Sequence, residues 1–146
     1  MTQSHYTLYI GVSVNKDKTQ GAVGVAIYDE EHQLADSFAV LVDRNIDSTE
    51  LELTAIVECL RYAFNDDVIY STSDFCVRGY NEWLDDWKKR GWRKSDKKPV
   101  AYRQLWQLVD EERSEKFVDV RKLRSSPELD LAYRLAKEEL EEEEAR

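Results

Sequence analysis

Residues 83–100 read WLDDWKKRGWRKSDKKPV and hold three of the four tryptophans of the chain. Between Lys88 and Lys98 there are seven basic residues and one acid, Asp96, although the whole chain carries a formal net charge of -9. A basic run interleaved with tryptophan is typical of a surface that grips a phosphate backbone. The alternative is a solvated helix end whose tryptophans belong to the core.

The phosphate-gripping interpretation predicts direct contacts from this stretch, and the basic residues 121, 122 and 124 could extend the positive surface. For the rings of Trp83, Trp87 and Trp106, packing against the body is favoured over base stacking, because all three fall on helical faces. The predicted nucleic-acid-binding residues are Trp83, Trp87, Lys88, Lys89, Arg90, Trp92, Arg93, Lys94, Lys97 and Lys98.

The length of 146 residues and the 42% hydrophobic content predict a single domain over residues 1–140, followed by an acidic tail over residues 141–146. We expect a cytoplasmic protein without a membrane segment, since no apolar run approaches about 20 residues and the first residues do not resemble a signal peptide. Cys59 and Cys76 lack partner spacing for a disulfide or zinc, and buried free thiols are expected.

The hydrophobic periodicity predicts an order of three strands, a helix, a strand, two helices, a strand and a final helix. Ser48 is expected to cap the N-terminus of the first helix, and the pair Ser73 and Asp74 is expected to cap that of the second. Gly91 is expected to end the second helix. The predicted strands span residues 7–14, 21–28, 34–42, 67–71 and 116–120, and the predicted helices span residues 51–64, 75–89, 102–112 and 127–140.

Three segments together resemble the ribonuclease H family of the bacterial type. The segments are STSDFCVRGYNEWLDDWKKRGWRKSDKKPVAYRQLWQLVD at residues 71–110, LELTAIVECL at residues 51–60 and SSPELDLAYRLAKE at residues 125–138. The resemblance implies an α/β fold with a mixed five-stranded sheet, three antiparallel strands followed by parallel additions, with helices on both faces. It also implies an endonuclease that cuts the RNA strand of RNA/DNA hybrids with two divalent metal ions.

The four carboxylate positions of that family are mostly replaced in this sequence. The resemblance puts Gly11, Glu52, Ser73 and Tyr133 at those positions, so one carboxylate of four is retained. Two Mg²⁺ ions need several hard oxygen ligands, and we therefore expect no metal site, no cofactor and no catalytic residue. Mg²⁺ or Mn²⁺ would be required only if the protein were an active nuclease, with a compensated site built from Glu52 and Asp74, with or without Asp47.

Loops that handle the substrate in the family also differ here. The segment at residues 122–128, KLRSSPE, lacks the histidine of the family's flap, and NKDKTQG at residues 15–21 lacks its glycine-rich turn. In NIDSTEL at residues 45–51, Asp47 would repel the phosphate that the family holds there. Fold-bearing residues are thus retained while substrate-handling residues are lost.

These observations leave three functions open. The leading hypothesis is a noncatalytic ribonuclease H-like protein that binds RNA/DNA hybrid or structured RNA through its basic protrusion. The runner-up is a divergent but active metal-dependent nuclease, and the third is a scaffold whose basic protrusion docks an acidic protein. For the glutamate-rich end, EELEEEEAR, a solvated helix end is one interpretation. The other is a segment that folds back on the basic stretch and mimics nucleic acid.

Overall fold

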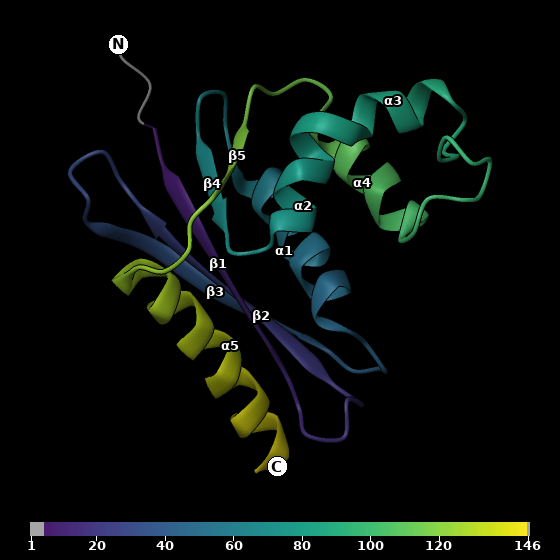
Figure 1. Ribbon diagram of the computed structural model, residues 1–146. Helices are drawn as coiled ribbons and strands as arrows, with labels where there is room; N and C mark the ends of the chain where they lie inside the picture. The colour runs from purple at the N-terminus through teal and green to yellow at the C-terminus, as the bar shows by residue number, and fades with distance from the viewer. Residues whose placement is uncertain (1–4, 146) are drawn as a thin grey trace.

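The computed structural model describes residues 5–145 and contains one mixed sheet flanked by helices (Figure 1). The strands are β1 (Thr7–Val14), β2 (Gly21–Tyr28), β3 (Leu34–Val42), β4 (Val68–Ser71) and β5 (Asp119–Lys122). The helices are α1 (Ser48–Tyr62), α2 (Asp74–Arg78), the π-helical turn η1 (Gly79–Trp83), α3 (Leu84–Lys89), α4 (Arg103–Arg113) and α5 (Pro127–Glu144).

The sheet has the strand order β3-β2-β1-β4-β5. β1 pairs antiparallel with β2, and β2 pairs antiparallel with β3. β4 adds parallel to β1, and β5 adds parallel to β4. The predicted fold class, three antiparallel strands with parallel additions, is confirmed.

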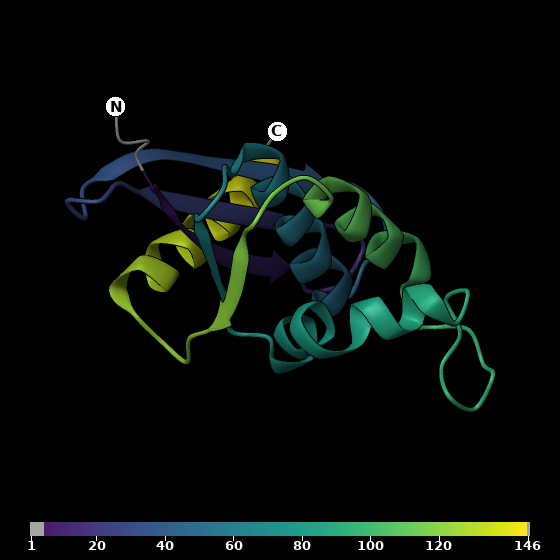
Figure 2. The same cartoon turned by 90° about the horizontal axis from the view of Figure 1, so that it is seen from above.

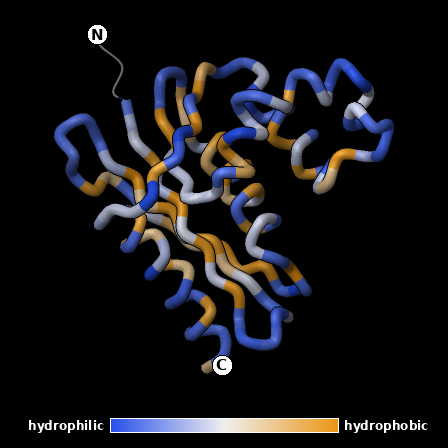
Figure 3. The backbone as a smooth tube through the Cα atoms, viewed as in Figure 1, coloured by the Kyte–Doolittle hydropathy of each residue, from blue (hydrophilic) through white to orange (hydrophobic). Residues whose placement is uncertain are grey.

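Helices cover both faces of the sheet, as the two views in Figures 1 and 2 show. α5 packs along β1, β2 and β3 on one face, whereas α1 packs on β1 and β2 from the other face and carries α4 on its outer side. The main core lies between α1 and the sheet and includes Leu8, Ile10, Leu53 and Ile56, all buried. Figure 3 shows the hydrophobic residues concentrated along these central elements.

α1 forms where the i, i+3, i+4 spacing predicts a helix, but its first cap differs from the prediction. Asp47 is the N-cap, and its side chain accepts a hydrogen bond from the backbone N–H of Glu50 at 2.8 Å. The prediction of Ser48 as the cap is wrong, because Ser48 is already the first helical residue. The predicted cap at Ser73 is confirmed, since its hydroxyl accepts from the Cys76 N–H at 3.2 Å.

The helix predicted over residues 75–89 is interrupted by the π-helical turn η1 at Gly79. A Cβ at Gly79 would lie 2.5 Å from Cζ2 of Trp106, so the ring of α4 reaches the backbone of η1 only because residue 79 has no side chain. Gly91 adopts φ +66°, a left-handed conformation that ends this helical region as predicted.

The last strand starts three residues later than predicted, at Asp119 instead of Lys116. Lys116 and Phe117 are held by the end of α1 and the connection that follows it: the Lys116 ammonium donates to the Leu60 carbonyl, and the Phe117 N–H donates to Asn65 Oδ1. The ladder with β4 therefore begins at the pair Val68 and Asp119.

The final helix runs further than predicted, to Glu144, and most of the expected acidic tail is helical. Both cysteines are buried free thiols, as predicted. Within residues 5–145, no helix is long and apolar enough to cross a membrane.

Candidate functional site

A small cavity of about 230 Å³ lies where α5 meets β1. It gathers three of the four residues predicted at family carboxylate positions, namely Gly11, Glu52 and Tyr133. Ser73 is not in the cavity wall, because its hydroxyl caps α2, and its neighbour Thr72 lines the wall instead. The lining residues are Ile10, Gly11, Val12, Glu52, Thr72, Arg124, Ser125, Leu129, Asp130 and Tyr133.

Gly11 lies directly beneath the backbone of α5. A Cβ at this position would overlap the backbone nitrogen of Tyr133 and the carbonyl carbon of Ala132. Gly24 faces Gly11 across the β1–β2 ladder, and a Cβ there would overlap the Ala132 carbonyl oxygen. The helix thus rests on a pair of adjacent glycines, and any side chain at position 11 requires the helix to move away.

Glu52 is the one retained carboxylate, and it is buried with 6% of its surface exposed. Burial raises its pKa to about 7, although the Ser71 hydroxyl, which donates to Oε2 at 2.8 Å, acts in the opposite direction. Near neutral pH a large fraction of Glu52 is therefore protonated. A protonated carboxyl is a poor ligand for Mg²⁺, which binds ionised carboxylates.

The residues around Glu52 do not fit a pair of Mg²⁺ ions. Asp74 is exposed and pairs with the Lys122 ammonium at 3.4 Å. Asp47 caps α1 and accepts a hydrogen bond from the Tyr102 hydroxyl at 3.0 Å. Across residues 5–145, no three His, Cys, Asp or Glu side chains are grouped to hold a metal ion. Asp130 is the second acid among the described residues that line the cavity.

The basic stretch, here called the basic hairpin and defined as residues 88–99, begins with the last two residues of α3 and continues as a loop that projects beyond this helix (Figures 1 and 2). A bridge between Arg93 and Pro99 closes it, and the Lys94 N–H donates to the Lys98 carbonyl at 2.9 Å. A concavity of about 280 Å³ in the hairpin is lined by Arg90, Arg93, Lys94, Ser95 and Lys97.

Most cationic side chains of the hairpin are exposed and available for an anionic ligand. Lys88 is an exception, because its ammonium pairs with Asp110 at 3.0 Å. Arg93 donates to the Lys97 carbonyl at 3.2 Å. Among the described residues, no ion pair involves Lys89, Arg90, Lys94, Lys97 or Lys98.

The tryptophan rings attach the hairpin to the body of the protein. Trp106 is fully buried and Trp87 is 9% exposed, with ring centroids 5.4 Å apart, while Trp83 lies 5.7 Å from Trp87. Trp83 and Trp92 are half-buried. The packing role predicted for Trp83, Trp87 and Trp106 is confirmed. Because its ring is buried, Trp87 would act on a ligand indirectly, by positioning the backbone of the basic hairpin.

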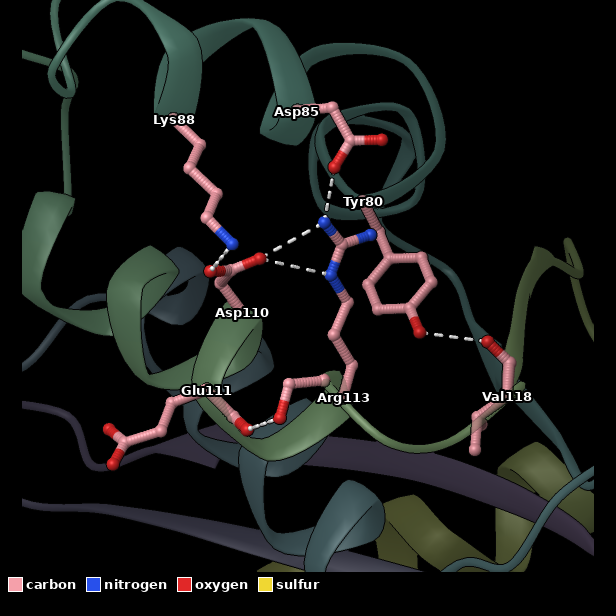
Figure 4. Close-up of polar contacts among 8 residues, drawn as sticks. Tyr80, Asp85, Lys88, Asp110, Glu111, Arg113 and Val118 are labelled. Atoms are coloured by element: carbon pink, nitrogen blue, oxygen red, sulfur yellow. Dashed lines mark hydrogen bonds and ion pairs between the residues drawn. The ribbon is translucent and has the colours of Figure 1, made fainter.

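A polar network holds α3 against α4 (Figure 4). The Arg113 guanidinium pairs with both Asp85 and Asp110, and the Tyr80 hydroxyl donates to the Val118 carbonyl at 2.8 Å. Burial acts to raise the pKa of Asp110, but hydrogen bonds from Lys88 and Arg113 outweigh it and hold that pKa below its ordinary value. The network fixes the base of the basic hairpin.

Other charges on the molecule lie apart from the hairpin. Arg121 pairs with Asp119 at 2.8 Å, whereas Arg124 lines the cavity beside Gly11. The acidic end of α5 continues along the sheet face opposite α1 (Figure 1). The hypothesis that this segment folds back on the basic stretch is wrong for the described residues.

Sequence reasoning missed several residues that the structure brings together. Thr72 takes the cavity position assigned to Ser73, and Asp130 enters the wall one helical turn before Tyr133. The position of Asp130 could have been found from the sequence, because residues at i and i+3 share one face of a helix and Tyr133 was already assigned to the site. No sequence signal indicated that Arg44 and Arg103 would line a common cavity, because Arg103 lies 59 positions after Arg44 and only the fold brings them together.

The strand order, the crossover to β4 and the helix across β1 define a ribonuclease H-like fold. The solution structure of the PFV RNase H domain superposes with a TM-score of 0.78 at 20% identity, covering 94% of both chains. RNase H1 from Halobacterium salinarum superposes with a TM-score of 0.72 at 15% identity, covering 94% of this chain and 98% of the other.

The family model "RNase H" matches residues 3–126, and the chain belongs to the ribonuclease H family. Ribonuclease H of Bordetella pertussis is 40% identical over 72 residues, which are 48% of this chain and 46% of the relative. Ribonuclease H of Cupriavidus necator is 41% identical over 68 residues, 45% of this chain and 47% of the relative. The aligned part spans about half the length of these curated relatives.

Proposed function

We propose that this protein binds RNA/DNA hybrid through the basic hairpin and does not cleave it. The observation that carries the proposal is the contact of Gly11 with the backbone of Tyr133. In the family this position supplies a carboxylate, and here the space where such a side chain would begin is filled by α5. Restoring the family carboxylate at position 11 would therefore require α5 to move, in addition to the change of one residue.

The remaining acidic residues support the absence of hydrolysis. Two-metal hydrolysis needs carboxylates that hold both ions and orient a water molecule. Among residues 5–145, the side chain that hydrogen-bonds to Glu52 is the Ser71 hydroxyl and not a second carboxylate, and burial raises the pKa of Glu52 to about 7. Asp74 and Asp47, which could compensate, are engaged with Lys122 and with the first turn of α1.

Binding is supported by the exposed cations of the hairpin. They form a local positive surface, although the whole chain has a formal net charge of -9. Each lysine or arginine that meets a phosphate releases a condensed counterion, so affinity falls steeply with salt. A foamy viral protease-reverse transcriptase solved in complex with RNA/DNA hybrid superposes on this chain with a TM-score of 0.77 at 16% identity, covering 92% of this chain and 19% of the other. That complex makes RNA/DNA hybrid the first ligand to test.

The test is a gel shift with RNA/DNA hybrid, duplex RNA and duplex DNA over a salt series. We expect hybrid binding at low salt, and a variant with Lys89, Lys94 and Lys97 changed to Gln should lower the salt slope by about two to three. The matched control changes Arg61, Arg134 and Lys137 to Gln, which removes the same charge from exposed positions of α1 and α5, outside the hairpin.

Three outcomes would contradict the proposal. Equal losses in the two triple variants would mean that the hairpin has no special role. Preference for duplex RNA would redirect the proposal to structured RNA. An absence of binding to all three nucleic acids at low salt would favour a scaffold that docks an acidic protein through the hairpin.

A further inference from the structure

One edge of the sheet offers its backbone to a further strand. β3 stands at the end of the strand order β3-β2-β1-β4-β5, so that β2 is its single neighbour among the described strands. None of the nine residues of β3 is buried, whereas β2 is buried in all but its last residue. An edge strand of this kind presents a row of N–H and C=O groups that another strand can bind.

The outward-facing backbone groups of β3 belong to alternate residues. In an antiparallel ladder, consecutive residues direct their N–H and C=O groups to opposite sides of the strand. The Ser37 N–H donates to Asp36 Oδ1 at 2.8 Å, as a group that points away from β2 can do. Ala39 and Leu41 follow at the same period and face outward with it. By the same alternation, the backbone groups of Val40 point toward β2.

The β3 edge lacks the features that protect other sheet edges. Charged residues, proline and short length protect an edge from pairing. The opposite edge, β5, has this protection, because it is four residues long and carries Asp119, Arg121 and Lys122. Residues 37–42 of β3 read SFAVLV and hold neither a charge nor a proline. Since α1 packs on β1 and β2, Phe38 and the apolar residues after it stay half-buried.

The acidic end of α5 lies beside this edge (Figure 2). Leu41 of β3 packs against the cluster that Ala22, Ala136 and Leu140 form. The chain continues from Leu140 directly into a run of glutamates. Three of them are exposed and belong to no ion pair among residues 5–145, namely Glu141, Glu142 and Glu144.

The charge of this region decides which strand fits the edge. A second copy of the chain, paired through β3 about a twofold axis, would bring two glutamate-rich helix ends to the same edge. Like charges repel, and the net charge of -9 on each copy adds to the repulsion. A strand rich in lysine or arginine would instead meet these glutamates and the exposed Asp36 with favourable charge.

We propose that the β3 edge and the acidic end of α5 together form a docking site for a basic, extended segment of another protein. The segment adds to the sheet as a strand beside β3. Hydrogen bonds to Ala39 and Leu41 hold its backbone, and the glutamates of α5 select its basic side chains. The inference is independent of hybrid binding, because the basic hairpin lies away from β3 (Figure 2).

The charge requirement is tested by fluorescence anisotropy with a labelled peptide of alternating lysine and valine, about seven residues long. Changing Glu141, Glu142 and Glu144 to Gln should weaken binding about tenfold and reduce its salt dependence. The matched control removes the same charge from exposed positions around α3 and α4, with the substitutions Asp86→Asn, Glu111→Gln and Glu115→Gln. Equal losses in the two triple variants, or no binding of the peptide at low salt, would overturn the proposal.

The strand pairing is tested through the backbone of the peptide. A peptide of the same sequence with N-methylated amides keeps the charge and loses the hydrogen-bond donors, so it should bind at least about tenfold more weakly. Hydrogen exchange gives a second measurement: the peptide should slow exchange at the amides of Ala39 and Leu41 and leave Val40 unchanged. Equal binding of the methylated peptide, or unchanged exchange at Ala39 and Leu41, would rule out an added strand.

Ala39→Pro removes one outward N–H and keeps the side of β3 that pairs with β2, as prolines in edge strands do. This variant should weaken peptide binding about fivefold or more, with circular dichroism as the check that the fold is retained. Unchanged binding by a folded Ala39→Pro variant would contradict the proposal. Sedimentation of the unmodified protein alone tests the other occupant: a dimer that Ala39→Pro abolishes would assign the edge to a second copy and overturn the proposal.

Discussion

The backbone nitrogen of Tyr133 lies where a side chain on Gly11 would begin. This relationship joins the middle of the central strand to the middle of the last helix, and Gly24 on β2 meets the same helix in the same way. The close approach of α5 excludes a carboxylate at position 11 and gives the helix its seat on the sheet. The same contact therefore holds α5 on the sheet and prevents a metal-binding carboxylate at position 11.

Gly11→Ala should destabilise the protein by about 1–3 kcal/mol, the usual cost of overpacking a close contact. In a strand without this contact, the same change would be neutral or stabilising, because alanine loses less backbone entropy than glycine. The measurement is the free energy of unfolding in urea. Tyr133→Ala is the matched control, since it removes a ring that is 49% exposed and keeps the backbone contact. A Gly11→Ala variant as stable as the unmodified protein would mean that α5 does not rest on the glycine pair.

Glu52→Gln should change how stability depends on pH. Burial raises the pKa of Glu52 to about 7 from 4.5, so the folded protein holds this proton more tightly than the unfolded chain. The contribution to stability is full below pH 4.5 and is lost as the pH rises to about 7. Removing the titration should leave stability nearly unchanged at about pH 4.5 and raise it by up to about 3 kcal/mol at about pH 8.

Urea unfolding of Glu52→Gln across this pH range checks the prediction. Glu138→Gln, on an exposed part of α5, serves as the control that should leave the pH profile unchanged. If the free energy of unfolding of Glu52→Gln changed with pH in parallel with that of the unmodified protein, a group other than Glu52 would be responsible for the pH dependence.

Arg113→Ala should loosen the attachment of the basic hairpin. Arg113 joins Asp85 and Asp110, and its side chain is 20% exposed, so the loss should fall between that of an exposed pair and that of a fully buried one. We expect about 1–3 kcal/mol in unfolding free energy, with faster hydrogen exchange in α3. Arg121→Ala breaks an exposed pair with Asp119 and should cost less than about 1 kcal/mol. Equal effects of the two substitutions would mean that the Arg113 network does not hold the base of the basic hairpin.

Much of the fold could be predicted because its determinants are local. The spacing of Leu53, Ile56 and Leu60 in α1 and the β-branched runs of β1 and β2 reflect the periods of a helix and a strand. Errors arose where a distant partner decided the outcome. The start of β5 is displaced because Phe117 is bound to Asn65, which lies 52 positions earlier in the chain.

The candidate site was predictable by residue type but not by packing. The sequence indicates that Gly11 and Tyr133 replace carboxylates, yet it contains no signal that α5 lies on the glycine itself. The assignment of Ser73 instead of Thr72 to the cavity reflects a similar limit. At the turn between β4 and α2, a shift of one residue decides whether a side chain caps the helix or faces the cavity.

The most direct test of the central claim is to follow binding and cleavage of a labelled RNA/DNA hybrid in the same samples, with Mg²⁺ or Mn²⁺ present. We predict a shifted hybrid whose RNA strand stays intact, with binding that weakens as salt is raised. Cleavage of the RNA strand that depends on the metal and disappears in Glu52→Gln would contradict the claim and identify the protein as an active nuclease.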